Sequence, residues 1–343
     1  MRFQKLIIGV VVVGILLVAG YFSMNAYIQK VAKERVDSWI QNEHLQNRLT
    51  YASIKSNLLG RRIVLTDVRY TVKGRYKKRL TGYFLIKRLV LSGNWKDHYV
   101  VNSYNATLYG KIASEQQEVP IVHIEHATFD TTKQRGFVKH MSVQINQIRF
   151  DESLIKQLQK GDLKKIVKLD EPINVHFEFS ADFKKKELDI KRYRLDFKNN
   201  VVFSYSLFLR NVDFDRIGEL SKEYRRNPKD ITFVAQLVDQ FMKIKPALLN
   251  LEFVNQGLVT RAVDYLARKE GKTPKEVVDS LLSPLKSLPI PSAYPSVERF
   301  LLSKADKLKL TARNVRCLKL EELIRWIEKT HKPFEVIELK LSN

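Results

Sequence analysis

The feature that most constrains this chain is a strict alternation of apolar and polar side chains over residues 173–183, INVHFEFSADF. Ile173, Val175, Phe177 and Phe179 occupy every second position, and polar residues separate them. Successive side chains of a β-strand point to opposite faces, so this spacing places the four apolar residues together. The segment therefore predicts a strand with one apolar face and one polar face.

The same period of two recurs along the chain. In residues 201–212, VVFSYSLFLRNV, it places Val201, Phe203, Tyr205 and Leu207 on one face. Further alternating segments are 84–93, 97–110, 119–129, 137–150 and 187–197. Residues 48–70 read as two strands with a turn at 57–60. A series of strands that are each apolar on one side is typical of an antiparallel sheet.

Two of these segments change phase midway, near Asn146–Gln147 and near Lys191–Arg192. A bulge adds one residue to one strand and so shifts the face on which later side chains lie. We therefore expect a β-bulge at each place.

Helical spacing becomes frequent toward the C-terminus. Segments that begin at 147, 211, 255 and 314 each start with a polar turn residue and then space apolar side chains three or four apart. The part of the chain at about 213–330 is predicted to be rich in such helices, and the last strand ends the chain. These helices are expected to cover part of the apolar sheet face or to lie at its end.

Residues 6–22, LIIGVVVVGILLVAGYF, carry no charge. At a rise of about 1.5 Å per residue, seventeen residues are close to the minimum for a helix that crosses a bilayer. A cleavable signal peptide is the alternative, because Val18, Ala19 and Gly20 resemble a cleavage site. We favour an anchor, because the run is longer than the usual h-region of ~7–15 residues and ends in the aromatic residues Tyr21 and Phe22.

The predicted fold class is α+β: an N-terminal transmembrane helix, then a curved, mostly antiparallel sheet with helices packed on one face or end. The predicted organisation is a tail at 1–5, an anchor at 6–24, an amphipathic linker helix at 25–47 and an extracytoplasmic domain at 48–343. A short N-terminal tail before a long domain is typical of a signal anchor. We expect a single-pass inner-membrane protein with its N-terminus in the cytoplasm and its main domain in the periplasm.

Sixty Lys and Arg residues against 37 Asp and Glu give a formal net charge of +23, which predicts affinity for an anionic partner. Phospholipid headgroups and an acidic protein partner are the candidates; nucleic acid is disfavoured because no recognition fold is evident. The candidate contact residues for headgroups or an acidic partner are Arg61, Arg62, Lys73, Arg75, Tyr76, Lys77, Lys78 and Arg79. A basic surface exposed to solvent, without a dedicated ligand, is the alternative.

The sequence carries no catalytic motif that we can identify, so we expect a non-enzymatic protein with no catalytic residues and no cofactor. A hydrolase is the least favoured alternative. Cys317 is the single cysteine. His123 and His126 lie three apart in a predicted strand, so their side chains point to opposite faces and no metal site is expected.

The candidate apolar sheet face consists of Ile173, Val175, Phe177, Phe179, Val201, Phe203, Tyr205 and Leu207. An apolar face costs roughly 25 cal/mol per Å² when it is left in water, so helices, another sheet or acyl chains must lie against it. The sequence leaves these alternatives open.

The opening of the chain resembles AsmA-like envelope proteins. The resemblance is carried by the basic N-terminus, the apolar segment, the amphipathic helix and the segments LTYASIKSNLLGRRIVLTDV and FLIKRLVLSG, and it is best over residues 1–92. The later steps RNVDFDRIGEL and ARNVRCLKLEELI are also similar. The resemblance implies a membrane-anchored, non-enzymatic envelope protein that holds or guides a phospholipid or another envelope lipid, or assists envelope biogenesis. A scaffold that binds an acidic partner through a basic face is the alternative function.

Overall fold

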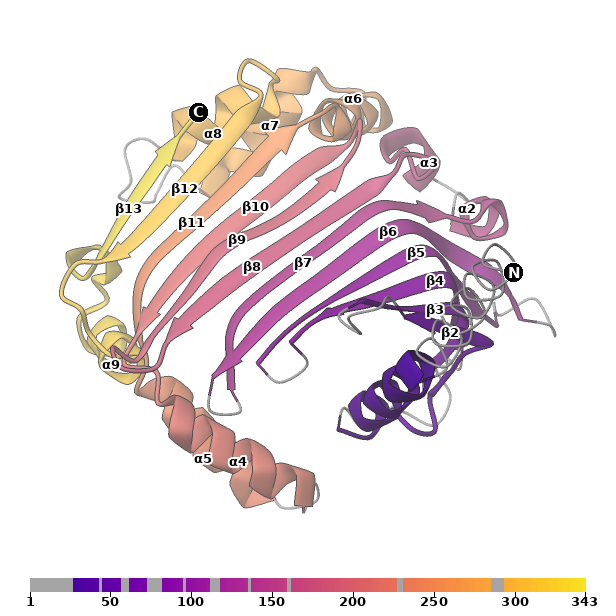
Figure 1. Ribbon diagram of the computed structural model, residues 1–343. Coiled ribbons are helices and arrows are strands. Elements are labelled where there is room, and N and C mark those ends of the chain that lie inside the picture. Colours follow the sequence, from indigo (N-terminus) through magenta and orange to yellow (C-terminus); the bar gives the residue numbers. More distant parts are fainter. Residues whose placement is uncertain are drawn as a thin grey trace, which may run out of the picture. The chain divides into compact units, whose positions relative to one another are not determined.

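The computed structural model describes residues 27–42, 45–56, 62–72, 82–94, 97–111, 118–134, 137–158, 162–226, 231–284 and 293–343. It consists of two compact units, Met1–Ile121 and Val122–Asn343. Figure 1 shows the elements of both, and each unit is described by itself.

The first unit is a small antiparallel sheet with one helix. Its central strands β3 (Arg62–Val72), β4 (Gly82–Gly93) and β5 (His98–Gly110) pair in chain order. Two short strands, β1 (Leu49–Thr50) and β2 (Ser53–Ser56), both pair with β3. Residues 27–42 form a helix.

This helix covers the apolar face of its sheet. Val36 of the helix is fully buried in one cluster with Ile63 and Leu65 of β3 and Leu91 of β4. Apolar positions three or four apart give the helix the stripe that makes this contact. The amphipathic segment that the sequence predicts as a linker therefore packs on strands.

The second unit is built on a longer antiparallel sheet, in which every strand pairs with its neighbours in chain order. Its strands are β6 (Val119–Gln134), β7 (Phe137–Phe150), β8 (Ile173–Asp182), β9 (Glu187–Phe197), β10 (Val201–Arg210), β11 (Lys245–Asn255), β12 (Lys307–Asn314) and β13 (Ile337–Ser342).

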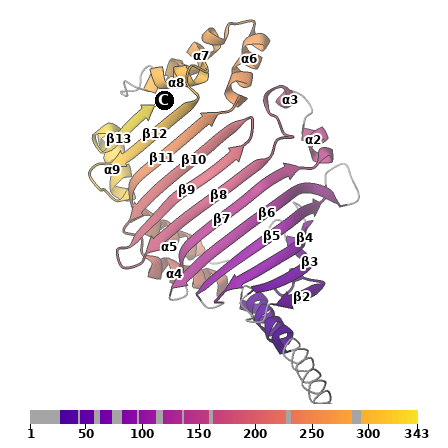
Figure 2. The ribbon, with the colours of Figure 1, turned by 45° about the horizontal axis from the view of Figure 1, so that its top comes forward.

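The helices of the second unit gather at the two ends of its strands, as Figures 1 and 2 show. At one end lie α2 (Glu152–Leu158), α3 (Leu163–Ile166), α6 (Leu258–Glu270), α7 (Pro274–Leu282) and α8 (Ala293–Leu301). At the other end lie α4 (Phe214–Arg226), α5 (Ile231–Met242) and α9 (Leu320–Thr330). A short 3₁₀ turn at Pro333–Glu335 follows α9.

The buried apolar side chains of the second unit belong mainly to these helices. Val263 of α6 and Val278 and Leu282 of α7 form one cluster, and Leu220 of α4 is fully buried. Phe300 of α8 is also buried. The helices therefore pack chiefly against one another and against the strand ends.

Both predicted β-bulges are confirmed. The β7–β8 pairing shifts register between Ile145 and Ile148, where Gln147 adopts a left-handed conformation with φ 56°. The β8–β9 pairing skips Lys191. The main-chain N–H of Gln147 donates to Oδ1 of Asn174 at 2.8 Å, so the extra residue keeps a hydrogen-bond partner.

The predicted transmembrane helix is not supported. Its segment, residues 6–24, lies outside the described residues, as does the turn expected at 57–60. Within the described ranges, no helix is long and apolar enough to span a bilayer. This finding contradicts three predictions. They are the fold class that includes a membrane-spanning helix, the signal anchor, and the location as a single-pass inner-membrane protein with a periplasmic domain. The described fold is antiparallel sheet, with a helix on the sheet face in the first unit and helices at the strand ends in the second.

Candidate functional site

A row of apolar side chains crosses all eight strands of the second unit at one level. Each member faces the next across a strand pair, so all eight side chains lie on the same face of the sheet. We call this the central row. It comprises Phe129, Val143, Phe177, Tyr193, Tyr205, Leu251, Leu310 and Leu341.

Two further rows flank the central row on the same face. Toward α6 the residues in register are Ala127, Ile145, Val175, Leu195, Phe203, Phe253 and Leu308. Toward α4 they are Thr131, Met141, Phe179, Ile190, Leu207, Leu249, Ala312 and Leu339. The three rows together are called the apolar face below.

Ring contacts connect the middle of this face. Tyr193 stacks on Tyr205 with ring centroids 5.0 Å apart, and it meets the edge of Phe177 at 6.4 Å. Phe203 lies 4.9 Å from Phe253 on the next strand. Aromatic pairs at these separations attract one another, so the rings form one continuous apolar surface over β8–β11.

The opposite face of the same strands is polar. Its row directly beside the central one comprises Gln144, His176, Arg194, Ser204, Glu252, Lys309 and Ser342. Ion pairs lie on this face, including Lys307–Glu252 at 2.7 Å and Arg194–Asp196 at 3.2 Å. One side of the sheet is thus adapted to water and the other is not.

The apolar face remains in part accessible to solvent. Every side chain of the central row is only half-buried, and Phe253 beside it keeps 37% of its surface exposed. In the first unit, by contrast, Ile63 and Leu65 are fully buried beneath the helix at 27–42. Burial of apolar surface is the dominant favourable term in association, so a half-open apolar face is a surface to which an apolar ligand can bind.

The structure brings together the predicted apolar residues. Those of β8 and those of β10 share one face, with β9 between them. Ile173 and Val201 flank Phe197 near the α6 end, and Leu207 lies two strands from Phe179 in one row.

Most of the predicted basic contact residues lie outside the described residues. This holds for Arg61, Lys73, Arg75, Tyr76, Lys77, Lys78 and Arg79. Arg62 is described, as the exposed first residue of β3. The headgroup or acidic-partner role of this cluster stays a prediction.

Sequence reasoning missed β11, which supplies Leu249, Leu251 and Phe253 to the apolar face. A signal was present, because Asn250 and Glu252 alternate with these three residues. The flanking helical segments obscured this short stretch of period two.

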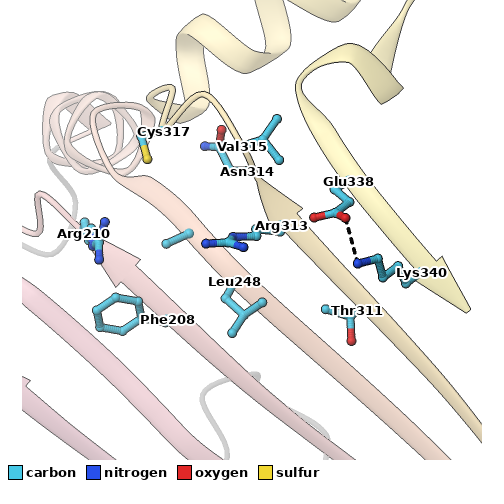
Figure 3. Close-up of a pocket in the computed structure, with 11 residues that line it drawn as sticks. Phe208, Arg210, Leu248, Thr311, Arg313, Asn314, Val315, Cys317, Glu338 and Lys340 are labelled. Carbon is cyan, nitrogen blue, oxygen red and sulfur yellow. Dashed lines mark ion pairs between the residues drawn. The ribbon is translucent and has the colours of Figure 1, made fainter.

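A hollow of about 630 Å³ lies on the polar side of the sheet, near the ends of β10–β13 (Figure 3). Arg210, Arg313 and Lys340 line it together with one carboxylate, Glu338. Lys340 pairs with Glu338 at 2.9 Å, and Lys340 and Arg313 hold the pKa of that carboxyl below its ordinary value. Cys317 lies at the rim and is exposed.

The two neighbouring histidines have separate partners. His123 lies 3.1 Å from Asp151, and His126 lies 3.3 Å from the Thr128 hydroxyl. In the part of the chain that the structure describes, no group of three or more His, Cys, Asp and Glu residues is arranged to hold a metal ion.

Comparison with known proteins gives a distant similarity and no family match. No family model matches the chain. The chain is 21% identical over 276 residues to an uncharacterized protein of Aquifex aeolicus (strain VF5), and the match covers 80% of this chain and 74% of that one.

Proposed function

We propose that the second unit binds the acyl chains of lipids on its apolar face and so holds or guides lipid without catalysing a reaction. The observation that carries this proposal is the central row, in which eight strands in succession each contribute a half-buried apolar side chain. The resemblance to AsmA-like envelope proteins supports the same proposal.

Acyl chains fit this surface better than a compact polar ligand does. The three rows consist of aliphatic and aromatic side chains, apart from the buried Thr131 at the edge and the phenol oxygens of Tyr193 and Tyr205. Such a surface has few donors or acceptors with which to orient polar groups, whereas it removes hydrocarbon from water along its whole length. A chain of methylene groups gains roughly 0.8 kcal/mol for each group that it buries.

The test is binding of a fluorescent fatty acid to the full chain, together with cross-linking by a photoactivatable fatty acid and mapping of the labelled peptides. Tyr193→Ser combined with Tyr205→Ser removes the centre of the row. We expect roughly tenfold weaker binding, because each substitution removes an apolar side chain from the contact.

The matched control changes the adjacent residues of the same two strands on the polar face, as Arg194→Ser with Ser204→Ala. It is expected to bind like the wild-type chain. Cross-links confined to the polar face, or equal losses of affinity in the two double variants, contradict acyl-chain binding at the apolar face.

The hollow on the polar side favours a second candidate, a scaffold that binds an acidic protein partner. Its three cations face one carboxylate, so an acidic segment would find net positive charge there. The discriminating measurement is salt dependence: capture of an acidic partner weakens as ionic strength rises, whereas acyl-chain binding does not.

A further inference from the structure

Helix α5 carries a stripe of exposed apolar side chains. Val234 and Val238 are each 53% exposed and Phe241 is 50% exposed. Positions four and seven residues apart lie on one face of a helix, so the three form one surface, called the α5 stripe here. The inner side of α5 packs on α4, where Phe233 stacks on Tyr224 with ring centroids 4.7 Å apart.

A lysine-rich turn lies at the strand end that carries α4 and α5. Lys184, Lys185 and Lys186 form the exposed turn between β8 and β9. Lys186 reaches Asp213 at 3.8 Å, directly before α4, so this turn lies beside the start of the α4–α5 pair. Lysines close to a surface of anionic lipids are attracted to it, by about 1 kcal/mol for each residue.

The apolar face continues to this end of the strands. Ala181 of β8 is paired with Leu188 of β9, and beyond it the ring of Phe183 lies 6.0 Å from Phe137 and 5.0 Å from Phe214, the first residue of α4. The three rings come from β7, from the turn between β8 and β9, and from α4, which meet at one place.

A hollow of about 520 Å³ opens at this meeting point. Its apolar lining is Phe137, Ala181 and Phe183, and its charged lining consists of two lysines and two carboxylates: Lys139, Lys184, Asp182 and Asp215. The hollow therefore lies between the end of the apolar face and the start of α4, the helix on which α5 packs.

The stripe is better matched to a bilayer than to a second copy of this chain. Three side chains offer far less than the roughly 800 Å² per partner that a standard stable interface buries. A chain with a net charge of +23 repels its own copy, whereas it is attracted to an anionic leaflet. An amphipathic helix needs only a narrow apolar face to lie in the headgroup region, with that face about 5–10 Å deep.

We propose that the α5 stripe lies in the surface of a phospholipid bilayer with anionic headgroups, and that the hollow beside Phe137 and Phe183 is where an acyl chain passes between that bilayer and the apolar face. The passage of acyl chains rests on the proposed function; the bilayer contact of α5 stands without it.

The experiment places an environment-sensitive fluorophore on α5 of the full chain. Cys317→Ser removes the native thiol, and Val238→Cys then provides one labelling site within the stripe. Gln236→Cys is the matched control, because Gln236 lies on the opposite side of α5 and accepts a hydrogen bond from Arg216 of α4. The probe reports only on its own surroundings, so binding of another part of the chain to the membrane does not produce the signal.

Vesicles of phosphatidylcholine with phosphatidylglycerol are added, with and without a lipid that carries a quencher in its acyl chain. The label at 238 is expected to shift its emission to the blue and to be quenched by that lipid, while the label at 236 does neither. The shift is expected to be smaller with phosphatidylcholine alone and in the background of Lys184→Ser with Lys185→Ser.

The label at 238 staying in water on anionic vesicles overturns the proposal. So does a blue shift that appears without vesicles as the protein concentration rises, because a second copy then covers the stripe. If the label fails to enter the bilayer while the fluorescent fatty acid still binds, only the bilayer contact is wrong. If the label enters and the fatty acid does not bind, acyl-chain binding is wrong and the bilayer contact stands.

Discussion

Asn200 and Arg261 lie 61 positions apart in the sequence, and the Nη2 group of Arg261 donates to Oδ1 of Asn200 at 2.8 Å. Arg261 also donates through Nε to the carbonyl of Ile166 at 2.7 Å. The fully buried Asn200 donates to the carbonyls of Lys168 and Lys198, each at 3.0 Å. The turn between β9 and β10 is thereby joined to α6 and to the segment after α3.

Asn200→Ala is expected to lower the free energy of unfolding by about 3 kcal/mol, because it leaves buried main-chain groups without partners. Chemical denaturation followed by circular dichroism measures this change. Lys198→Ala, a nearby exposed position, is the control and is expected to change stability by less than about 0.5 kcal/mol. Equal effects of the two substitutions would show that the buried amide does not hold this junction.

The covered face of the first unit and the open face of the second predict different costs for the same substitution. Leu65 is fully buried under the helix at 27–42, so Leu65→Ala is expected to cost about 3 kcal/mol. Leu251 is half-buried in the central row, so Leu251→Ala is expected to cost about 1 kcal/mol. Urea denaturation of both variants provides the comparison. Equal costs would mean that the apolar face is covered in solution.

Asp151 predicts a loss of stability in acid. Burial raises the pKa of this carboxyl, but hydrogen bonds from the N–H and hydroxyl of Ser153 and from His123 outweigh burial and hold the pKa below its ordinary value. The unfolded chain, with an ordinary Asp pKa of about 3.9, therefore takes up the proton first as the pH falls. The stabilisation is present above that pH and is lost as the pH falls through the lower pKa of the folded state.

The measurement for Asp151 compares the wild-type chain with Asp151→Asn, which keeps an acceptor at the start of α2 but has no charge. The difference in the free energy of unfolding is expected to shrink as the pH falls from about 5 to below about 4. A difference that does not change over this range would contradict the assigned pKa direction.

Local periodicity was enough to predict the strands that carry the apolar face. The alternation at 173–183 corresponds to β8, and the segment 137–150 corresponds to β7. The phase shift at Asn146–Gln147 predicted the bulge, because one extra residue moves the later apolar side chains to the other face of the strand.

What covers an apolar face could not be predicted, since periodicity describes one element and not its partner. The helix at 27–42 has an apolar stripe, as α5 has, yet Val36 is buried against β3 while Val238 faces solvent. The helical patterns of the C-terminal third left open whether those helices cover the sheet face or lie at its end, and the structure places them at the strand ends. The hydropathy of residues 6–22 likewise predicted a membrane anchor. No helix among the described residues is long and apolar enough to span a bilayer.

Under the proposed function, the length of the central row limits how much hydrocarbon it can accommodate. Neighbouring strands are about 4.8 Å apart, so the seven intervals between its eight side chains extend over roughly 34 Å. The hydrocarbon core of a bilayer, which is two acyl chains deep, is about 30 Å thick. An acyl chain aligned with the row would therefore fill about half of it, so the central row by itself has room for two such chains bound end to end.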